Sequence, residues 1–355
     1  MNIPLCDIRA SDAPYRAEID DAIKNVIDKS KFILNSNNDK WCPVRDFEEN
    51  FAKYIGVKHC VGVSSCTAAL HLALEVAVDK SCLIPTRTVT ADIEAVCLAK
   101  MASYLYDNPS YVHMAAPPET IIVVHLYGMP CDVSKMQVGF ETIIEDCAQA
   151  TGSEVNGKKC GSLGDISCFS FFPSKPLGCY GDGGAVCTND DELAEEVRAL
   201  RNHGRKQGEK YKHDFIGYNY RLDGLQAAML NVKLRHLPNA IKRRRNISKI
   251  YERWLEDIEE IKIPIEPPNC KSAYYTYTIE ADKRDDLRDF LKSNGISTGL
   301  HYPIPLHRQP AYADPKYDFP EADAWALRTL SLPMFPALTE ENVKYISQKV
   351  REFYG

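Results

Sequence analysis

The stretch "SFFPSKPLGCYGDGG", residues 170–184, places one lysine, Lys175, between an aromatic run and a glycine cluster. A lysine usually lies on a solvated surface, where its ammonium group has a pKa of ~10.4. Phe171 and Phe172 precede this lysine, so we expect its amine to be partly desolvated. A desolvated lysine loses its charge more readily, and the neutral amine can form an imine with an aldehyde. Glycines at 178, 181, 183 and 184 let backbone and a flat ligand approach closely.

Length and charge restrict the class of protein. The chain has 355 residues, 45% of them hydrophobic, which predicts a large domain and a smaller one with a sizeable core. Its net charge is −6, from 49 acidic and 43 basic residues, so no basic field is available for a nucleic acid partner. The basic run "IKRRRN" at 241–246 is interpreted as the solvated face of a helix.

The N-terminus has no basic segment followed by an apolar core, and no later run reaches the ~18 apolar residues that span a bilayer. These patterns predict a cytoplasmic protein without a membrane partner. None of the 13 cysteines forms a C-x-x-C motif. Free buried thiols are therefore expected, with zinc or disulfides much less favoured and no metal site predicted.

Helical and strand patterns alternate along the first two thirds of the chain, as in α/β proteins. A long helix over 225–258, broken or kinked at Pro238, leads to a smaller strand-and-helix region. The sequence predicts a large domain over 1–235 with a mixed, mostly parallel sheet and a small α+β domain over 236–355. The expected helices are 13–33, 47–56, 64–77, 284–296 and 342–355, and the expected strands 60–65, 121–128, 142–150, 166–173, 184–190 and 273–281.

A carboxylate ends one of the apolar strands. Asp146 closes "TIIED", and in a parallel sheet such strand ends face a ligand crevice. Facing the ring nitrogen of a pyridoxal ring, Asp146 would keep that nitrogen protonated, so the ring would draw electrons from a substrate carbanion. The alternative is an aspartate that only caps a helix, which is equally common at such a position.

A possible phosphate site follows the first strand. In "SSCTAAL", Ser65 and Thr67 lie at a helix start, where free backbone N–H groups suit a phosphate. A cap without a ligand is the alternative. An imine-forming lysine, an aspartate at a strand end and a phosphate site together describe one cofactor, pyridoxal phosphate.

The chain resembles the DegT/DnrJ/EryC1 sugar aminotransferases, which have the aspartate aminotransferase fold (fold type I). The resemblance runs over nearly the whole chain, through "FEENFAKYIGVKHCVGVSSCTAALHLAL", "IIEDCAQATG", "IGYNYRLDGLQAAML" and "HYPIPLHRQPAY". Within the group, "SFFPSKPLGCYGDGGA" and "HYPIPLHRQPA" look most like enzymes that aminate C3 of a UDP-linked 3-keto-hexuronate, the UDP-2-acetamido-2-deoxy-3-oxo-glucuronate 3-aminotransferase type.

The resemblance implies roles around the cofactor ring. Lys175 would form the Schiff base and move the proton between the donor carbon and the cofactor. Asp146 would pair with the ring nitrogen, Ala148 would lie against the ring, and Gln149 would hydrogen-bond the ring hydroxyl. Glutamate would convert pyridoxal phosphate to pyridoxamine phosphate, which would then aminate the keto sugar.

The resemblance also implies a phosphate site, a dimer and a sugar site. Ser170 and the helix start at Ser65, Cys66 and Thr67 would hold the phosphate. Asn219 would reach the cofactor of the neighbouring subunit, which makes the active unit a homodimer with shared sites. The residues that would face the sugar nucleotide are Arg221, His301 and Tyr302. Each of these roles has a structural alternative. Arg221 would instead form a salt bridge with Asp223 or a neighbour, and His301 would be a histidine with satisfied hydrogen bonds at the domain junction.

The chain departs from the family pattern on one side of the cofactor. Cys66 stands where the family has glycine, and Val89 replaces the aromatic residue that stacks on the ring, so weaker cofactor binding is expected. Arg87 stands where an apolar residue is usual. A non-catalytic or regulatory pyridoxal-binding protein is therefore kept as an alternative, whereas Lys175 argues against a sugar dehydratase, in which histidine replaces the lysine. TDP- and GDP-linked keto-6-deoxysugars are the alternative substrates.

Overall fold

The computed structural model describes residues 2–34, 41–77, 80–107, 118–136, 139–206 and 208–355. Seven described strands form the central sheet in the order β1-β9-β8-β5-β4-β2-β3. Among them β9 alone runs antiparallel to its neighbours, which confirms the expected mixed, mostly parallel sheet. The strands are β1 (His59–Val63), β2 (Ser81–Pro85), β3 (Ala102–Tyr106), β4 (Thr120–Val124), β5 (Thr142–Asp146), β8 (Ile166–Ser170) and β9 (Gly184–Thr188).

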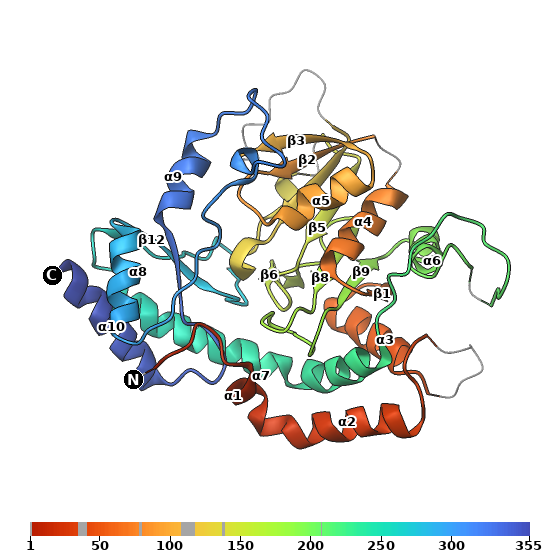
Figure 1. The fold of residues 1–355 in the computed structure, drawn as a ribbon, viewed down its shortest axis with the longest axis horizontal. Helices are drawn as coiled ribbons and strands as arrows, with labels where there is room; N and C mark the ends of the chain where they lie inside the picture. Colours follow the sequence, from red (N-terminus) through yellow and green to blue (C-terminus); the bar gives the residue numbers. More distant parts are fainter. Residues whose placement is uncertain (1, 35–40, 78–79, 108–117, 137–138, 207) are drawn as a thin grey trace.

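Helices cover both faces of this sheet (Figure 1). Strand residues alternate between the two layers, as the period of two requires: Ile166 and Cys168 of β8 pack on one side, and Phe169 on the other. The first layer holds α4 (Cys66–Val76), α5 (Thr90–Leu98) and α6 (Asp191–Leu200), and the second holds α3 (Pro43–Ile55) and the start of α7 (Gly224–Leu255). Strands that lie between two helix layers are buried on both faces, which explains their largely hydrophobic runs.

The C-terminal part is built on its own small sheet. The antiparallel strands β10 (Ile261–Lys262), β12 (Tyr277–Ala281) and β13 (Thr329–Leu332) pack with α8 (Arg284–Ser293) and α10 (Glu340–Tyr354) around a separate core. α9 (Pro320–Arg328) precedes β13. A further small sheet joins β11 (Cys270–Lys271) to the hairpin β6 (Glu154–Val155) and β7 (Lys158–Lys159). It links the C-terminal part to the loop after β5.

The helix α7 connects the two parts of the molecule. It is continuous from Gly224 to Leu255, so of the expected break or kink at Pro238 the break is wrong. Leu230 and Leu237 pack in the core of the large sheet, whereas Tyr251 and Leu255 pack in the C-terminal core. Burial on both sides of the proline compensates for the hydrogen bond that it cannot donate. A domain boundary between residues 235 and 236 would lie inside this helix, and it remains a prediction.

The N-terminus lies beside the C-terminal helices (Figure 1). Ile3 is buried in the C-terminal core and forms a parallel bridge with Ile296. The chain then passes through α1 (Ile8–Asp12) to α2 (Arg16–Asp28), which runs along α7. Residues before α2 therefore tie the C-terminal core to the large sheet.

The 13 cysteines are all free, and most are buried, as expected. No helix in the described ranges is both long and apolar enough to cross a bilayer.

A close backbone approach at the start of β9 generates a stability prediction. A Cβ on Gly184 would lie 2.4 Å from the carbonyl oxygen of Ser65 and 2.8 Å from the nitrogen of Cys66. Gly184→Ala should therefore displace the start of α4 and lower the free energy of unfolding by about 1–3 kcal/mol, as overpacking does. Urea denaturation of the purified protein measures this loss.

Gly181→Ala is the matched control, because a Cβ there meets only the end of the flexible Gln226 side chain, at 2.8 Å. An equal loss of stability in both variants would contradict the proposed clash with α4.

Candidate functional site

The loop between β8 and β9 carries Lys175 and closes tightly on itself. The Cys179 N–H donates to the Phe171 carbonyl at 2.8 Å, and the Lys175 N–H donates to the Phe172 carbonyl at 2.9 Å. A Cβ on Gly178 would lie 2.4 Å from the Pro173 carbonyl oxygen, so glycine is required where the loop closes. The lysine is thus presented on a short rigid turn.

The surroundings of Lys175 are only partly apolar. Phe171 is fully buried, but Phe172 is 51% exposed, so only one of the two flanking phenylalanines packs in the interior. Lys175 itself is half-buried, and its Nζ lies 4.5 Å from the centre of the Tyr275 ring. Tyr275 is held by a 3.1 Å hydrogen bond between its hydroxyl and Ser174 Oγ. A cation–π contact therefore orients the amine.

Asp146 lies at the carboxyl end of β5 and is 2% exposed. Its Oδ1 accepts a 2.8 Å hydrogen bond from the Ala148 N–H, in a turn that does not continue as a helix. The helix-cap alternative is therefore wrong. Burial raises the pKa of Asp146, while the Ala148 N–H and the charge of Lys175 oppose that rise. The amine and the carboxyl group thus interact across one site.

The start of α4 faces the same carboxylate. Ser65 Oγ accepts from the Ala68 N–H at 3.1 Å, so this hydroxyl is used as the helix cap. The Cys66 side chain lies toward Asp146, with 3.9 Å between Sγ and Oδ1, and burial raises the pKa of its thiol. Cys66 and Thr67 belong to the first helical turn, whose N–H groups have no acceptor within the helix. These backbone N–H groups can bind an anion whatever the side chain at position 66.

Ser170 and Gln149 are also buried here, at 7% and 4% exposure. Ser170 ends β8, and its Oγ accepts from the Phe172 N–H at 3.3 Å. Gln149 Oε1 accepts from the Tyr127 N–H at 2.6 Å, and Gln149 Nε2 donates to the Tyr302 hydroxyl at 3.0 Å. The Tyr302 hydroxyl, from the C-terminal part, thus contacts the loop that follows β5.

His301 is joined to both parts of the molecule. Its Nδ1 shares a 2.8 Å hydrogen bond with Ser331 Oγ of β13, and the Tyr127 hydroxyl donates to its carbonyl oxygen. Burial lowers the pKa of His301, and the charge of Lys175 lowers it further. His301 therefore has the hydrogen bonds that the structural alternative expects, but it also lies within the electrostatic reach of Lys175.

Asn219 and Arg221 lie on the segment that precedes α7. Asn219 is exposed and forms an antiparallel bridge with Asn202. Arg221 Nη1 donates to Asn202 Oδ1 at 3.0 Å, and its buried Nε has no acceptor among the described residues. Arg221 thus bonds to Asn202 in place of the salt bridge to Asp223 that the sequence offered as an alternative. No described contact joins either residue to Lys175. The role of Asn219 at the neighbouring subunit's cofactor and the role of Arg221 at the sugar nucleotide remain predictions.

The departures Val89 and Arg87 lie on the segment between β2 and α5. Val89 is half-buried directly before α5. Arg87 Nε lies 2.9 Å from Asp107 Oδ1, so this guanidinium pairs with an acid at the end of β3. The contribution of Val89 to the ring face remains a prediction.

Sequence reasoning missed several residues of the site. Tyr127 and Tyr275 contact Gln149, His301 and Lys175 from two different parts of the chain. Asp92 in α5 is fully buried beside Asp146. Tyr127 lies at the end of the predicted strand 121–128, which could have indicated it, but no local pattern points to Tyr275 or Asp92.

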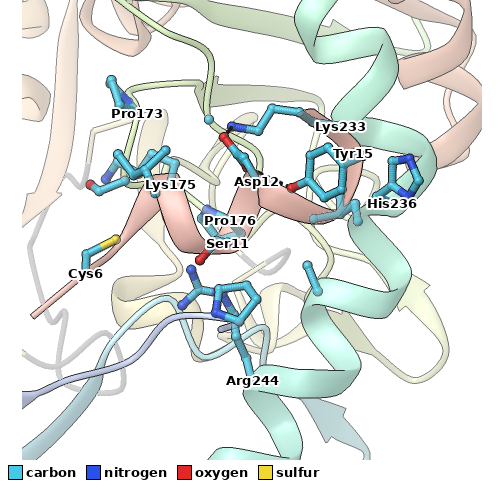
Figure 2. Close-up of a pocket in the computed structure, with 16 residues that line it drawn as sticks. Cys6, Ser11, Asp12, Tyr15, Pro173, Lys175, Pro176, Lys233, His236 and Arg244 are labelled. Atoms are coloured by element: carbon cyan, nitrogen blue, oxygen red, sulfur yellow. Dashed lines mark hydrogen bonds and ion pairs between the residues drawn. The ribbon is translucent and has the colours of Figure 1, made fainter. Parts of the chain in front are cut away.

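The Lys175 loop is supported from its far side. Figure 2 shows Lys175 and Pro176 across a cavity of about 40 Å³ from the N-terminal segment and α7. Behind it, Lys233 Nζ lies 2.8 Å from Asp12 Oδ2, and both side chains are buried. Tyr180, in the same loop, donates to the same carboxylate at 2.8 Å. This network connects α1, the lysine loop and α7.

One buried cluster has the residue types of a metal site: His125, Glu145 and Cys147. His125 Nε2 lies 2.9 Å from Glu145 Oε2, and His125 Nδ1 accepts from the Cys131 N–H at 3.0 Å. Backbone N–H groups at 161, 163 and 164 also donate to the Glu145 carboxylate, at 2.7 to 2.8 Å. Hydrogen bonds therefore explain this cluster, which anchors the end of β5 next to Asp146.

The donor set fits pyridoxal phosphate. Lys175 supplies an amine and Asp146 a carboxylate. Ala148 adds a small side chain that is 6% exposed, and the first turn of α4 supplies N–H groups for a phosphate. Asp146, Cys66 and His301 all lie within the electrostatic reach of Lys175.

Comparisons with known proteins agree with this fit. The model of the DegT/DnrJ/EryC1/StrS aminotransferase family matches residues 15–351. A pleiotropic regulatory protein of Geobacillus stearothermophilus is 38% identical, over 100% of this chain and 99% of the relative. A UDP-N-acetyl-3-dehydro-alpha-D-glucosamine 3-aminotransferase of Acidithiobacillus ferrooxidans is 39% identical, over 98% of this chain and 97% of the relative.

The fold is shared with solved aminotransferases. The crystal structure of S. venezuelae DesV in complex with a ketimine intermediate has a TM-score of 0.93 and 35% sequence identity, and it covers 99% of this chain and 98% of its own. Matches of this extent and identity show that the chain belongs to the DegT/DnrJ/EryC1/StrS family of aminotransferases, which use pyridoxal phosphate.

Proposed function

We propose that the protein transfers an amino group from L-glutamate to C3 of a UDP-linked 3-keto-hexuronate, in the synthesis of a polysaccharide or glycan. The observation that carries the amino transfer is the proximity of Asp146 to the first turn of α4 and its electrostatic interaction with Lys175. When bound there, pyridoxal phosphate supplies an electron sink for proton removal next to the transferred nitrogen.

Each residue then has a task. Lys175 holds the cofactor covalently and moves the proton, and the Tyr275 ring at 4.5 Å orients its amine. Asp146 keeps the ring nitrogen protonated, with one oxygen fixed by Ala148. Gln149, already oriented by Tyr127 and Tyr302, is placed for the ring hydroxyl.

The phosphate would lie between Ser170 and the N–H groups of Cys66 and Thr67. Asn219 is exposed, as a residue that contributes to a neighbouring subunit's site must be. A homodimer with shared sites, in the cytoplasm, is therefore part of the proposal.

The sugar is proposed from chemistry at Arg221, His301 and Tyr302. The free Nε of Arg221, oriented by Asn202, offers a donor to a carboxylate or diphosphate. Relatives named for 3-amino sugars on UDP support the C3 position, and one of them is named for an oxo-glucuronate. TDP- and GDP-linked sugars are alternatives, because relatives named for them also match the chain.

A regulatory, non-catalytic protein is the second candidate function. It is favoured by the departures at Cys66 and Val89 and by the name of one full-length relative. Glutamate added to the purified, cofactor-loaded protein separates the two. A catalyst shifts its visible absorption band on the timescale of turnover, whereas a protein that only binds the cofactor keeps its spectrum.

Lys175→Ala should abolish the visible absorption band that depends on the covalent lysine link. Turnover should fall by more than the ~10²–10⁴-fold that general acid–base catalysis contributes, because the nucleophile is lost as well. Absorption spectra and rates of glutamate-dependent amination check this. Lys344→Ala, an exposed lysine paired with Glu340 in α10, should keep both properties. Ordinary turnover in Lys175→Ala would remove the central assignment.

Arg221→Ala tests the carboxylate. A uronate that binds in a buried site needs a fixed cation, so kcat/KM for the UDP-linked 3-keto-hexuronate should fall by about 2–5 kcal/mol in transition-state free energy. The matched substrate is the UDP-linked 3-keto sugar with a hydroxymethyl group in place of the carboxylate, for which the loss should be small. Equal losses for both substrates would leave Arg221 only a diphosphate or structural role.

A further inference from the structure

A second buried acid lies beside Asp146. Asp92, in the first turn of α5, has no exposed surface. Its Oδ2 accepts a 2.6 Å hydrogen bond from Thr88 Oγ1. Its Oδ1 is also buried and has no hydrogen-bond donor among the described residues. A buried carboxylate oxygen without a donor is strongly disfavoured, so this oxygen requires a proton of its own or a partner.

The acidic neighbour that acts on Asp92 is Asp146, both through its charge and as a hydrogen-bonding side chain. Burial raises the pKa of Asp92 well above its usual range, and the charge of Asp146 raises it further. Burial also raises the pKa of Asp146, but the Ala148 N–H and Lys175 oppose that rise. Two adjacent buried carboxyl groups do not both ionise, so the proton belongs to Asp92.

The other groups around Asp92 do not alter this assignment. Among the described residues, titratable groups on which Asp92 acts electrostatically include Cys66 of α4, Tyr106 of β3, Cys168 of β8 and Tyr302. None of these is a cation. Lys175 and His125 act on Asp146. The surroundings therefore favour an ionised Asp146 and a neutral Asp92.

We propose that Asp92 is a positioning residue, which stays protonated and donates its proton in a hydrogen bond to Asp146. Thr88 occupies Oδ2, so the proton resides on Oδ1. The Ala148 N–H and Asp92 then fix the Asp146 carboxylate from two sides and leave one direction for the cofactor ring nitrogen. The hydrogen bond from Asp92 reduces the negative charge that Asp146 presents to the ring nitrogen. Asp146 therefore stabilises the proton on that nitrogen less strongly. The inference rests on the proposed role of Asp146.

The first test uses cofactor-free protein, so that it is independent of catalysis. A group with a raised folded-state pKa is protonated in the native state and ionised in the unfolded state above ~3.9. Native stability is therefore lost as pH rises toward the folded-state value. Relative to Asp92→Asn, which cannot ionise, the unfolding equilibrium constant of the wild type should rise up to about tenfold per pH unit.

Urea denaturation between pH 5 and 8 measures this difference. Glu94→Gln, an exposed acid on the same helix, is the matched control and should show the wild-type pH dependence. If Asp92→Asn folds poorly, carbon-13 NMR of aspartate-labelled wild type replaces it, and a protonated carboxyl signal should persist at pH 7. Equal pH slopes in wild type and Asp92→Asn, or no neutral carboxyl signal, would overturn the inference.

The second test uses protein loaded with cofactor labelled with nitrogen-15 in the ring. In Asp92→Leu, which removes the donor, the ring nitrogen should keep its proton to higher pH than in wild type, whereas Asp92→Asn retains an N–H donor and should change less. An unchanged nitrogen signal in Asp92→Leu would overturn the positioning role. If the wild type aminates the substrate normally but fails these tests, the inference about Asp92 is wrong and the proposed function stands. If Asp92 is protonated but no amination occurs, only the proposed function is wrong.

Discussion

The closure of the loop between β8 and β9 is the constraint on which the site depends. Phe171 and Cys179 are joined by a backbone hydrogen bond of 2.8 Å, and the chain between them must turn within seven residues. Gly178 makes this possible because any Cβ would meet the Pro173 carbonyl oxygen. Both ends of the loop continue into paired strands of the central sheet, so the sheet fixes the direction in which Lys175 leaves the backbone.

The second physical theme is the burial of titratable side chains. Asp146, Asp92 and Cys66 are all buried at the carboxyl ends of parallel strands or at helix starts nearby. Each would be unfavourable alone, and each is compensated by a neighbour: an N–H, a hydroxyl or a shared proton. The polar side chains therefore lie together at the carboxyl ends of the parallel strands, where ligands bind in open α/β sheets.

The C-terminal part completes this crevice from the other side. His301 and Tyr302 reach the large sheet through Ser331, Tyr127 and Gln149. The continuous helix α7 and the buried Asp12–Lys233 pair hold the two parts in a fixed relation behind the lysine loop (Figures 1 and 2). Pro238 does not interrupt this link, because packing on both sides outweighs the loss of one hydrogen bond.

By itself the sequence determined the order and type of most elements, since apolar periodicity, the Ser65 cap and the Gly56 stop are local properties of the chain. It also singled out Lys175 and Asp146, because a lysine beside glycines and an acid after an apolar strand are unusual locally. Only the tertiary structure decided that Asp146 begins a turn and no helix, that Phe172 is exposed, and that α7 passes unbroken through Pro238. It alone brought Asp92, Tyr127 and Tyr275 to the site. These residues come from segments far apart in the chain, and their contacts arise from packing, which no short-range pattern encodes.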